Sequence, residues 1–82
     1  MSTDALRALE HECERKADRV AHIIANRPRP SSWLVPARDA YRQAAAAAQM
    51  AKNVGDEAAR AELLSVADAY SAIGASLERL AR

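Results

Sequence analysis

Apolar residues recur at helical spacing in the first third of the chain, over about residues 4–25. They follow one another at steps of three or four residues, as Leu6, Leu9, Cys13, Ala17, Val20 and Ile24. Such steps keep side chains on one face of an α-helix. Asp4 is expected to be the N-cap or an acidic residue of the first turn, where its negative charge is stabilised by the positive end of the helix dipole. Pro28 disfavours helical geometry at the preceding residue, so we expect the helix to end before it.

A proline-containing linker over residues 26–32 separates this helix from a second one, over about residues 33–54. Ser31 or Ser32 is expected to cap the second helix. Its predicted inner face is mostly alanine: Leu34, Ala37, Tyr41, Ala44, Ala48 and Ala51. Because alanine side chains are short, this helix permits a neighbour to approach closely. We expect Gly55 to end it in the left-handed conformation that glycine adopts readily.

The third predicted helix, over about residues 56–81, carries the most regular pattern. After Ala59, apolar residues alternate at steps of four and three, as Leu63, Val66, Tyr70, Ile73, Leu77 and Leu80. This is a heptad-like seam, which predicts burial in the core or at an oligomer interface. Asp56 is the expected N-cap. A glycine within a helix, such as Gly74, lowers helix stability by about 1 kcal/mol relative to alanine. We therefore expect a close backbone contact there, which a side chain would prevent.

Composition supports an all-α fold in a single domain. The chain has 82 residues, of which 21 are alanine and only five are glycine or proline. The short loop before Asp56 makes the second and third helices an antiparallel hairpin. Two arrangements are compatible with this pattern: a closed three-helix bundle, and an oligomer in which helices of different chains pack together. An alanine-rich helix buries little apolar area, so we expect a homo-oligomer, with a dimer favoured.

The stretch from Tyr41 onward resembles a family of short alphaproteobacterial, alanine-rich helical-hairpin proteins. The matching residues are Tyr41, Arg42, Ala44, Ala45, Asp56, Arg60, Ala61, Leu63, Leu64, Ala67, Tyr70 and Leu77. The resemblance covers about half of the chain. It implies a bacterial protein with a helical hairpin and implies no activity.

Charge is balanced overall but uneven along the chain. Twelve basic and eleven acidic residues give a net charge of +1, which predicts no long-range attraction to nucleic acid or membrane. Residues 27–55 nevertheless carry five basic residues and only one acidic residue, Asp39. A small nucleic-acid-associated protein is therefore the alternative function. It would use Arg27, Arg29, Arg38 and Arg42, with Trp33 and Tyr41 for stacking.

The metal-capable side chains do not predict a metal site. His11 and Glu14 lie at i,i+3, but two ligands make no closed site. His11 and His22 are about 16 Å apart along a helix axis and cannot share a site within one chain. Cys13 is the only cysteine, so no disulfide forms within the chain, which fits a reducing cytoplasm. No segment has the run of about 20 apolar residues that a membrane span requires.

These observations favour a non-enzymatic protein-interaction module that needs no cofactor and acts through a helix face. A bundle this small offers little room for an enclosed catalytic pocket. The expected partner interface comprises Trp33, Leu34, Arg27 and Arg29, because tryptophan and arginine are enriched at binding hot spots. For Trp33 two placements remain open, and we favour burial as a plug at the end of the bundle over an exposed anchor.

Overall fold

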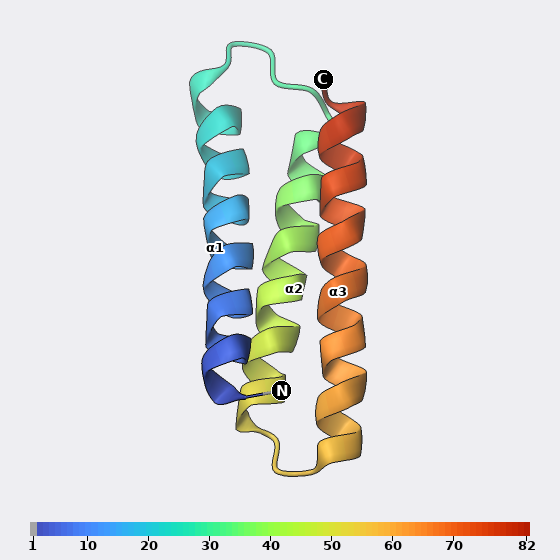
Figure 1. The fold of residues 1–82 in the computed structure, drawn as a ribbon. Helices are drawn as coiled ribbons and strands as arrows, with labels where there is room; N and C mark the ends of the chain where they lie inside the picture. Colours follow the sequence, from blue (N-terminus) through green and yellow to red (C-terminus); the bar gives the residue numbers. More distant parts are fainter. Residues whose placement is uncertain (1) are drawn as a thin grey trace.

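The computed structural model describes residues 2–82 and consists of three long helices. They are α1 (Thr3–Asn26), α2 (Leu34–Asn53) and α3 (Glu57–Leu80). The helix α2 runs antiparallel to the other two, and both α1 and α3 pack against it (Figure 1). The all-α prediction is confirmed, and each helix begins and ends within two residues of the position expected from sequence. Within residues 2–82, no helix is long and apolar enough to cross a membrane.

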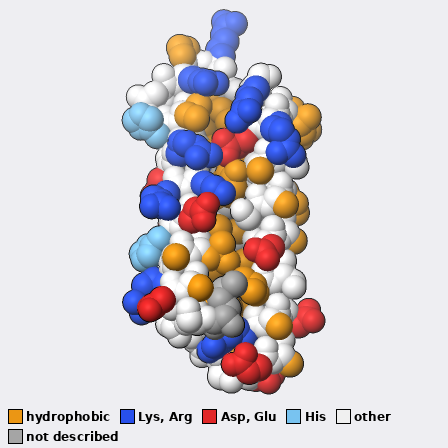
Figure 2. Space-filling model, in the orientation of Figure 1, with side chains coloured by type: hydrophobic (Ala, Val, Ile, Leu, Met, Phe, Trp, Pro, Cys, Tyr) orange, Lys and Arg blue, Asp and Glu red, His pale blue; other side chains and the backbone are white. Residues whose placement is uncertain are grey.

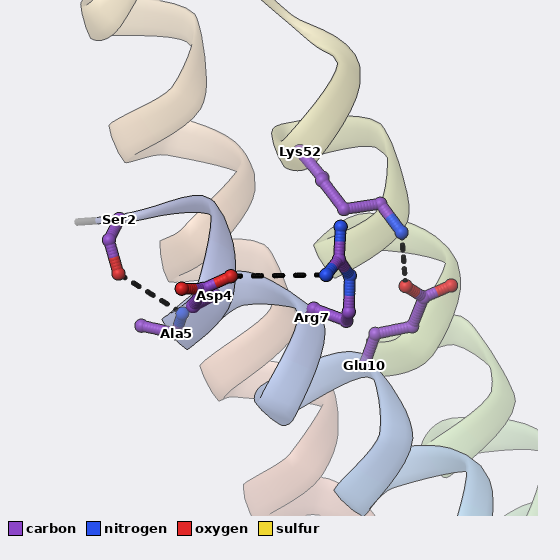
Figure 3. A network of polar contacts seen from close by, with 6 residues as sticks. All are labelled: Ser2, Asp4, Ala5, Arg7, Glu10 and Lys52. Atoms are coloured by element: carbon purple, nitrogen blue, oxygen red, sulfur yellow. Dashed lines mark hydrogen bonds and ion pairs between the residues drawn. The ribbon is translucent and has the colours of Figure 1, made fainter.

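The helix starts are fixed by short polar side chains. Ser2 is the N-cap of α1, and its hydroxyl accepts a hydrogen bond of 3.2 Å from the backbone N–H of Ala5. Asp4 lies in the first turn instead (Figure 3). As predicted, Asp56 caps α3, where its carboxylate accepts two backbone N–H bonds of 3.3 Å. The helix α2 is different: its N-cap position is Trp33, which makes no side-chain cap hydrogen bond, so the prediction that Ser31 or Ser32 caps this helix is wrong. The Ser31 hydroxyl instead accepts a 3.3 Å hydrogen bond from the backbone N–H of Trp33, one residue before the helix.

The α2–α3 turn differs from the prediction made for Gly55. No glycine in residues 2–82 has a positive φ, so Gly55 does not adopt the left-handed conformation. The chain instead leaves α2 in an extended conformation at Val54 (φ −96°, ψ 133°) and is still extended at Asp56. Arg60 stabilises this exit, because its guanidinium donates a 2.9 Å hydrogen bond to the carbonyl oxygen of Val54. A side chain thus supplies a donor to a carbonyl group at the end of α2 that has no partner within the helix.

The core of the molecule is the alanine-rich face of α2. Every residue predicted for that face is buried, and Tyr41, at 2% exposure, is by far its largest member. Three further alanines of α2 are buried beside them: Ala40, Ala45 and Ala47. Because α2 contacts a helix on each side, its buried arc is wider than a single stripe.

The helix α1 packs on α2 through the stripe expected from sequence, and also through one buried charge. Leu6, Cys13, Ala17 and Val20 are buried there. Glu10 is only 8% exposed, and its carboxylate accepts a 2.8 Å hydrogen bond from the Lys52 ammonium of α2 (Figure 3). Burial of an unpaired carboxylate is costly, so this ion pair favours the alignment of α1 on α2 in which Glu10 and Lys52 meet.

On the other side, α3 approaches α2 through its smallest residues. Ala67 and Gly74 are the buried residues of α3, and Ala67 packs with Ala47 and Ala48 of α2. A Cβ atom added at Gly74 would lie 2.7 Å from the Tyr41 ring. The predicted close contact at Gly74 is therefore confirmed, and its partner is an aromatic ring.

The two glycines provide a matched test of this contact. Gly74→Ala is expected to lower the free energy of unfolding by about 1–3 kcal/mol, because the new methyl group overlaps the Tyr41 ring. Gly55→Ala meets no atom within 4 Å and is expected to raise stability by about 0.4–1 kcal/mol through reduced freedom of the unfolded chain. Urea unfolding followed by circular dichroism measures both. A Gly74→Ala variant as stable as the wild type would show that the ring does not occupy this position.

Candidate functional site

The most distinctive surface is a stripe of apolar side chains along α3, which we call the α3 stripe: Leu63, Val66, Tyr70, Ile73, Leu77 and Leu80. Val66, Tyr70, Ile73 and Leu80 are between 37% and 58% exposed, whereas Leu63 and Leu77 are half-buried. Their predicted burial in the core of a single chain is therefore wrong for the four exposed residues. Burial between subunits stays a prediction.

The stripe is exposed because α3 turns a different line of residues toward α2. Ala67 and Gly74 define the contact line, and at 100° per residue the stripe lies about a quarter of a turn from it. Glu78, on the other flank of this line, pairs with Arg19 of α1 at 2.6 Å. The α3 stripe therefore faces away from α1. Small residues allow the closest helix contact, and this contact leaves the larger side chains outside.

Two large apolar side chains, one in α2 and one just before it, lie near the heights of the two ends of the stripe. Tyr41 packs against Gly74 and Ala48 against Ala67, which fixes the register of the two antiparallel helices. In that register Met50 is level with Ser65, one residue before Val66, and Trp33 is level with Arg82, two residues after Leu80. Both are exposed, Trp33 at 46%. Exposed apolar side chains thus extend over the full length of the α2–α3 hairpin, which is typical of a surface that binds another protein.

The folded chain is electrically polarised along its long axis. The half that contains the α1–α2 connection, made of residues 15–43 and 72–82, carries nine basic and three acidic side chains. The other half, made of residues 2–14 and 44–71, carries three basic and eight acidic side chains. Figure 2 shows most Lys and Arg side chains over the upper part of the visible face. The charge of one half is therefore +6 and that of the other −5.

A small polar network connects all three helices within the basic half. The Tyr41 hydroxyl donates a 2.6 Å hydrogen bond to the Glu78 carboxylate, and Arg19 of α1 donates to the same oxygen at 2.6 Å. Burial of the ring and the bond to Glu78 raise the pKa of Tyr41 to about 12. Lys16 stands over the ring at 5.8 Å from its centroid. Because one oxygen of the Glu78 carboxylate accepts from both Tyr41 and Arg19, the network connects α3 to α2 and to α1.

The residues of the expected partner interface do not all lie on the surface. Trp33 is exposed, so the prediction that it plugs the bundle is wrong: the chain places it before the first turn of α2, beyond the end of the core. Leu34, proposed for the interface, is instead 4% exposed and packs with Ala37 and Val20. Arg27 and Arg29 are exposed on the connection, as expected.

The remaining candidate side chains do not converge on one site. His11 lies 3.5 Å from Glu14, and His22 contacts the Asn26 amide one turn later. No group of three potential metal ligands occurs in the part of the chain from Ser2 to Arg82. Cys13 is buried and unpaired, and burial raises the pKa of its thiol. A buried thiol of raised pKa is suited to packing and poorly suited to nucleophilic chemistry.

Sequence reasoning missed the two interhelical ion pairs. Glu10 and Glu78 look like ordinary surface acids in the sequence, because each stands next to charged or polar neighbours. One signal was available for Glu10, which is four residues from Leu6 and three from Cys13 and therefore lies on the apolar face. For Glu78 no comparable signal exists, because its partners are 37 and 59 residues away.

Comparison with protein-family models, curated proteins and solved structures gives no match for this chain. Its function must therefore be inferred from the residues and geometry described above.

Neighbouring residues at the start of α2 test the revised placement of Trp33. Trp33→Ala is expected to change the free energy of unfolding by less than about 1 kcal/mol, because the indole is half exposed. Leu34→Ala should lower it by about 2–5 kcal/mol, as for other buried leucines. Chemical denaturation measures both variants. A larger loss for Trp33→Ala than for Leu34→Ala would reverse the two assignments.

The Tyr41 network predicts a specific pH dependence of stability. The pKa of Tyr41 is raised in the folded state from its ordinary value of 10 to about 12, so between these pH values the unfolded chain loses the proton first. The free energy of unfolding should therefore fall as pH rises from 10 to 12, through the preferential ionisation of the unfolded state. Tyr41→Phe should remove most of this fall, whereas Tyr70→Phe should retain it. Denaturation at a series of alkaline pH values tests this, and an unchanged slope in Tyr41→Phe would contradict it.

Proposed function

We propose that this chain is a non-enzymatic protein-interaction module that binds a helical surface through the α3 stripe. The single observation that supports it most is the stripe itself, six apolar residues in heptad spacing of which four are exposed. Recognition of this kind uses apolar anchors at i, i+3, i+4 and i+7 on an amphipathic helix. We place the module in the cytoplasm, because its one cysteine is a free thiol.

The energetic benefit of covering the stripe is substantial. Complete burial of a Val, Leu or Ile side chain contributes about 1.5–3 kcal/mol. In the isolated chain the four exposed residues of the stripe are only partly buried, so they obtain only part of this free energy. Binding of a partner would add the remainder. Met50 and Trp33 at the ends of the hairpin add two more anchors of the type enriched at interfaces. The gain must offset an association cost of about 4–15 kcal/mol.

Nucleic-acid binding is the second candidate, and the basic half of the molecule is the observation that favours it. Arg27, Arg29 and Arg42 are exposed there. Tyr41, however, is buried beneath Glu78 and Arg19 and has no exposed ring face for stacking. Arg38 is paired with its neighbour Asp39 at 3.1 Å. The aromatic contribution expected from sequence is therefore reduced to Trp33, which favours the protein-interaction function.

The test is a comparison of two variants that add the same charge to opposite faces of α3. Ile73→Glu places a carboxylate in the stripe, and Ala61→Glu places one on the exposed face turned away from it. Cross-linking in cells of the native host, followed by mass spectrometry, identifies the bound proteins and the residues in contact. We expect cross-links at the α3 stripe that Ile73→Glu reduces at least tenfold and Ala61→Glu retains.

Two outcomes would contradict the proposal. Equal recovery of the same partners with both variants would show that the stripe is not the binding surface. Recovery of nucleic acid alone, with a steep loss of retention as salt increases, would favour the second candidate, because phosphate contacts release counterions. Circular dichroism of both variants confirms that each remains folded.

A further inference from the structure

We infer that the partner of the α3 stripe is a second copy of this chain, packed antiparallel about a two-fold axis perpendicular to α3. This inference rests on the proposed function and adds the identity and orientation of the partner. Two independent observations support it: the spacing of the stripe and the axial separation of charge. An axis of this type passes between Tyr70 and Ile73, at the middle of the stripe.

The stripe matches its own reversed copy. Its steps are three, four, three, four and three residues, an order that is the same from either end. Reversal about the centre places Leu63 opposite Leu80 of the partner subunit, Val66 opposite the partner's Leu77, and Tyr70 opposite the partner's Ile73. All six side chains are then covered in one register. A self-complementary patch of this kind is what an isologous two-fold interface requires.

Charge determines the orientation, because spacing alone also allows a parallel pair. Within the α2–α3 hairpin, which carries the stripe, residues 34–43 and 72–82 have four basic and two acidic side chains, and residues 44–71 have two basic and four acidic side chains. In the antiparallel pair, the hairpin half of charge +2 therefore lies beside the partner's half of charge −2, and the same attraction occurs at the other end. In a parallel pair, halves of like charge lie side by side. The α3 stripe itself contains no charged residue, so the orientation depends on the flanks of the helices. Charge complementarity of this type selects orientation more than it adds affinity.

This interface would leave the contacts that connect the three helices unchanged. The stripe faces away from α1, and the Tyr41, Glu78 and Arg19 network lies between α1 and α3. Two copies therefore associate without rearrangement of either core. Association would also add buried apolar area to a chain whose central helix is mostly alanine, a common route to stability in small domains.

The test measures distances between spin labels on the two subunits. The buried Cys13 is first replaced in Cys13→Ala, and a single label is then attached in Ala58→Cys or Ala72→Cys, both exposed positions of α3 outside the stripe. In the antiparallel pair, the two labels at 58 are separated by about 40 Å along the axis, at 1.5 Å per residue. The two labels at 72 are at nearly the same height in either orientation. We expect a long distance for the first variant and a short one for the second.

Other results would overturn the inference. Short distances for both variants would establish a parallel pair, and no intermolecular distance for either would exclude a second copy. Sedimentation at increasing salt gives an independent readout, because screening should weaken the antiparallel pair and strengthen a parallel one. A purified chain that is monomeric, but still shows stripe-dependent cross-links to another protein in cells, would overturn this inference and leave the proposed function standing.

Discussion

The contact between Tyr41 and Gly74 is the constraint on which the rest of the molecule depends. Tyr41 is the largest fully buried side chain, and it lies in a helix whose other buried residues are nearly all alanine. Its ring fits only because α3 has no side chain at Gly74, where a single methyl group would overlap it. The ring carries its hydroxyl to Glu78, and Glu78 reaches Arg19 of α1. One aromatic residue of the middle helix thereby sets the height and separation of both outer helices.

The same constraint explains why the most regular apolar pattern in the sequence is on the surface. To accept the Tyr41 ring and the alanines of α2, α3 must turn Ala67 and Gly74 inward. Rotation of α3 by a quarter of a turn would bury the α3 stripe, but it would remove Gly74 from the ring and Glu78 from both its partners. The helix α3 therefore has two apolar surfaces. The one that packs on α2 consists of small residues, and the exposed one, which we propose as the binding surface, consists of large residues.

Periodicity was sufficient to predict the helices, their order and the inner face of α1, which packs mainly on α2. It predicted only part of the inner face of α2, because α2 contacts a helix on each side. It failed for α3, because the most hydrophobic line of residues on this helix, the α3 stripe, is not the buried line, which contains Ala67 and Gly74. A heptad seam indicates that a helix has a partner, but does not indicate whether that partner belongs to the same chain. Only the smallness of Ala67 and Gly74 signalled the true contact line, and small residues contribute little to a hydrophobic pattern. The exposure of Trp33 could not be predicted either, because it depends on whether α2 begins before or after this residue.

The separation of charge along the axis is a product of the fold rather than of the sequence order. The basic residues of α1, the connection, α2 and α3 come together because α2 reverses direction. Within the chain, Lys16, Arg19 and Arg38 of the basic half form ion pairs with carboxylates. In the antiparallel pair that we propose, a second chain would place opposite charge beside each end and would cover the α3 stripe at the same time. Apolar spacing and charge therefore favour one and the same assembly, although each depends on different residues.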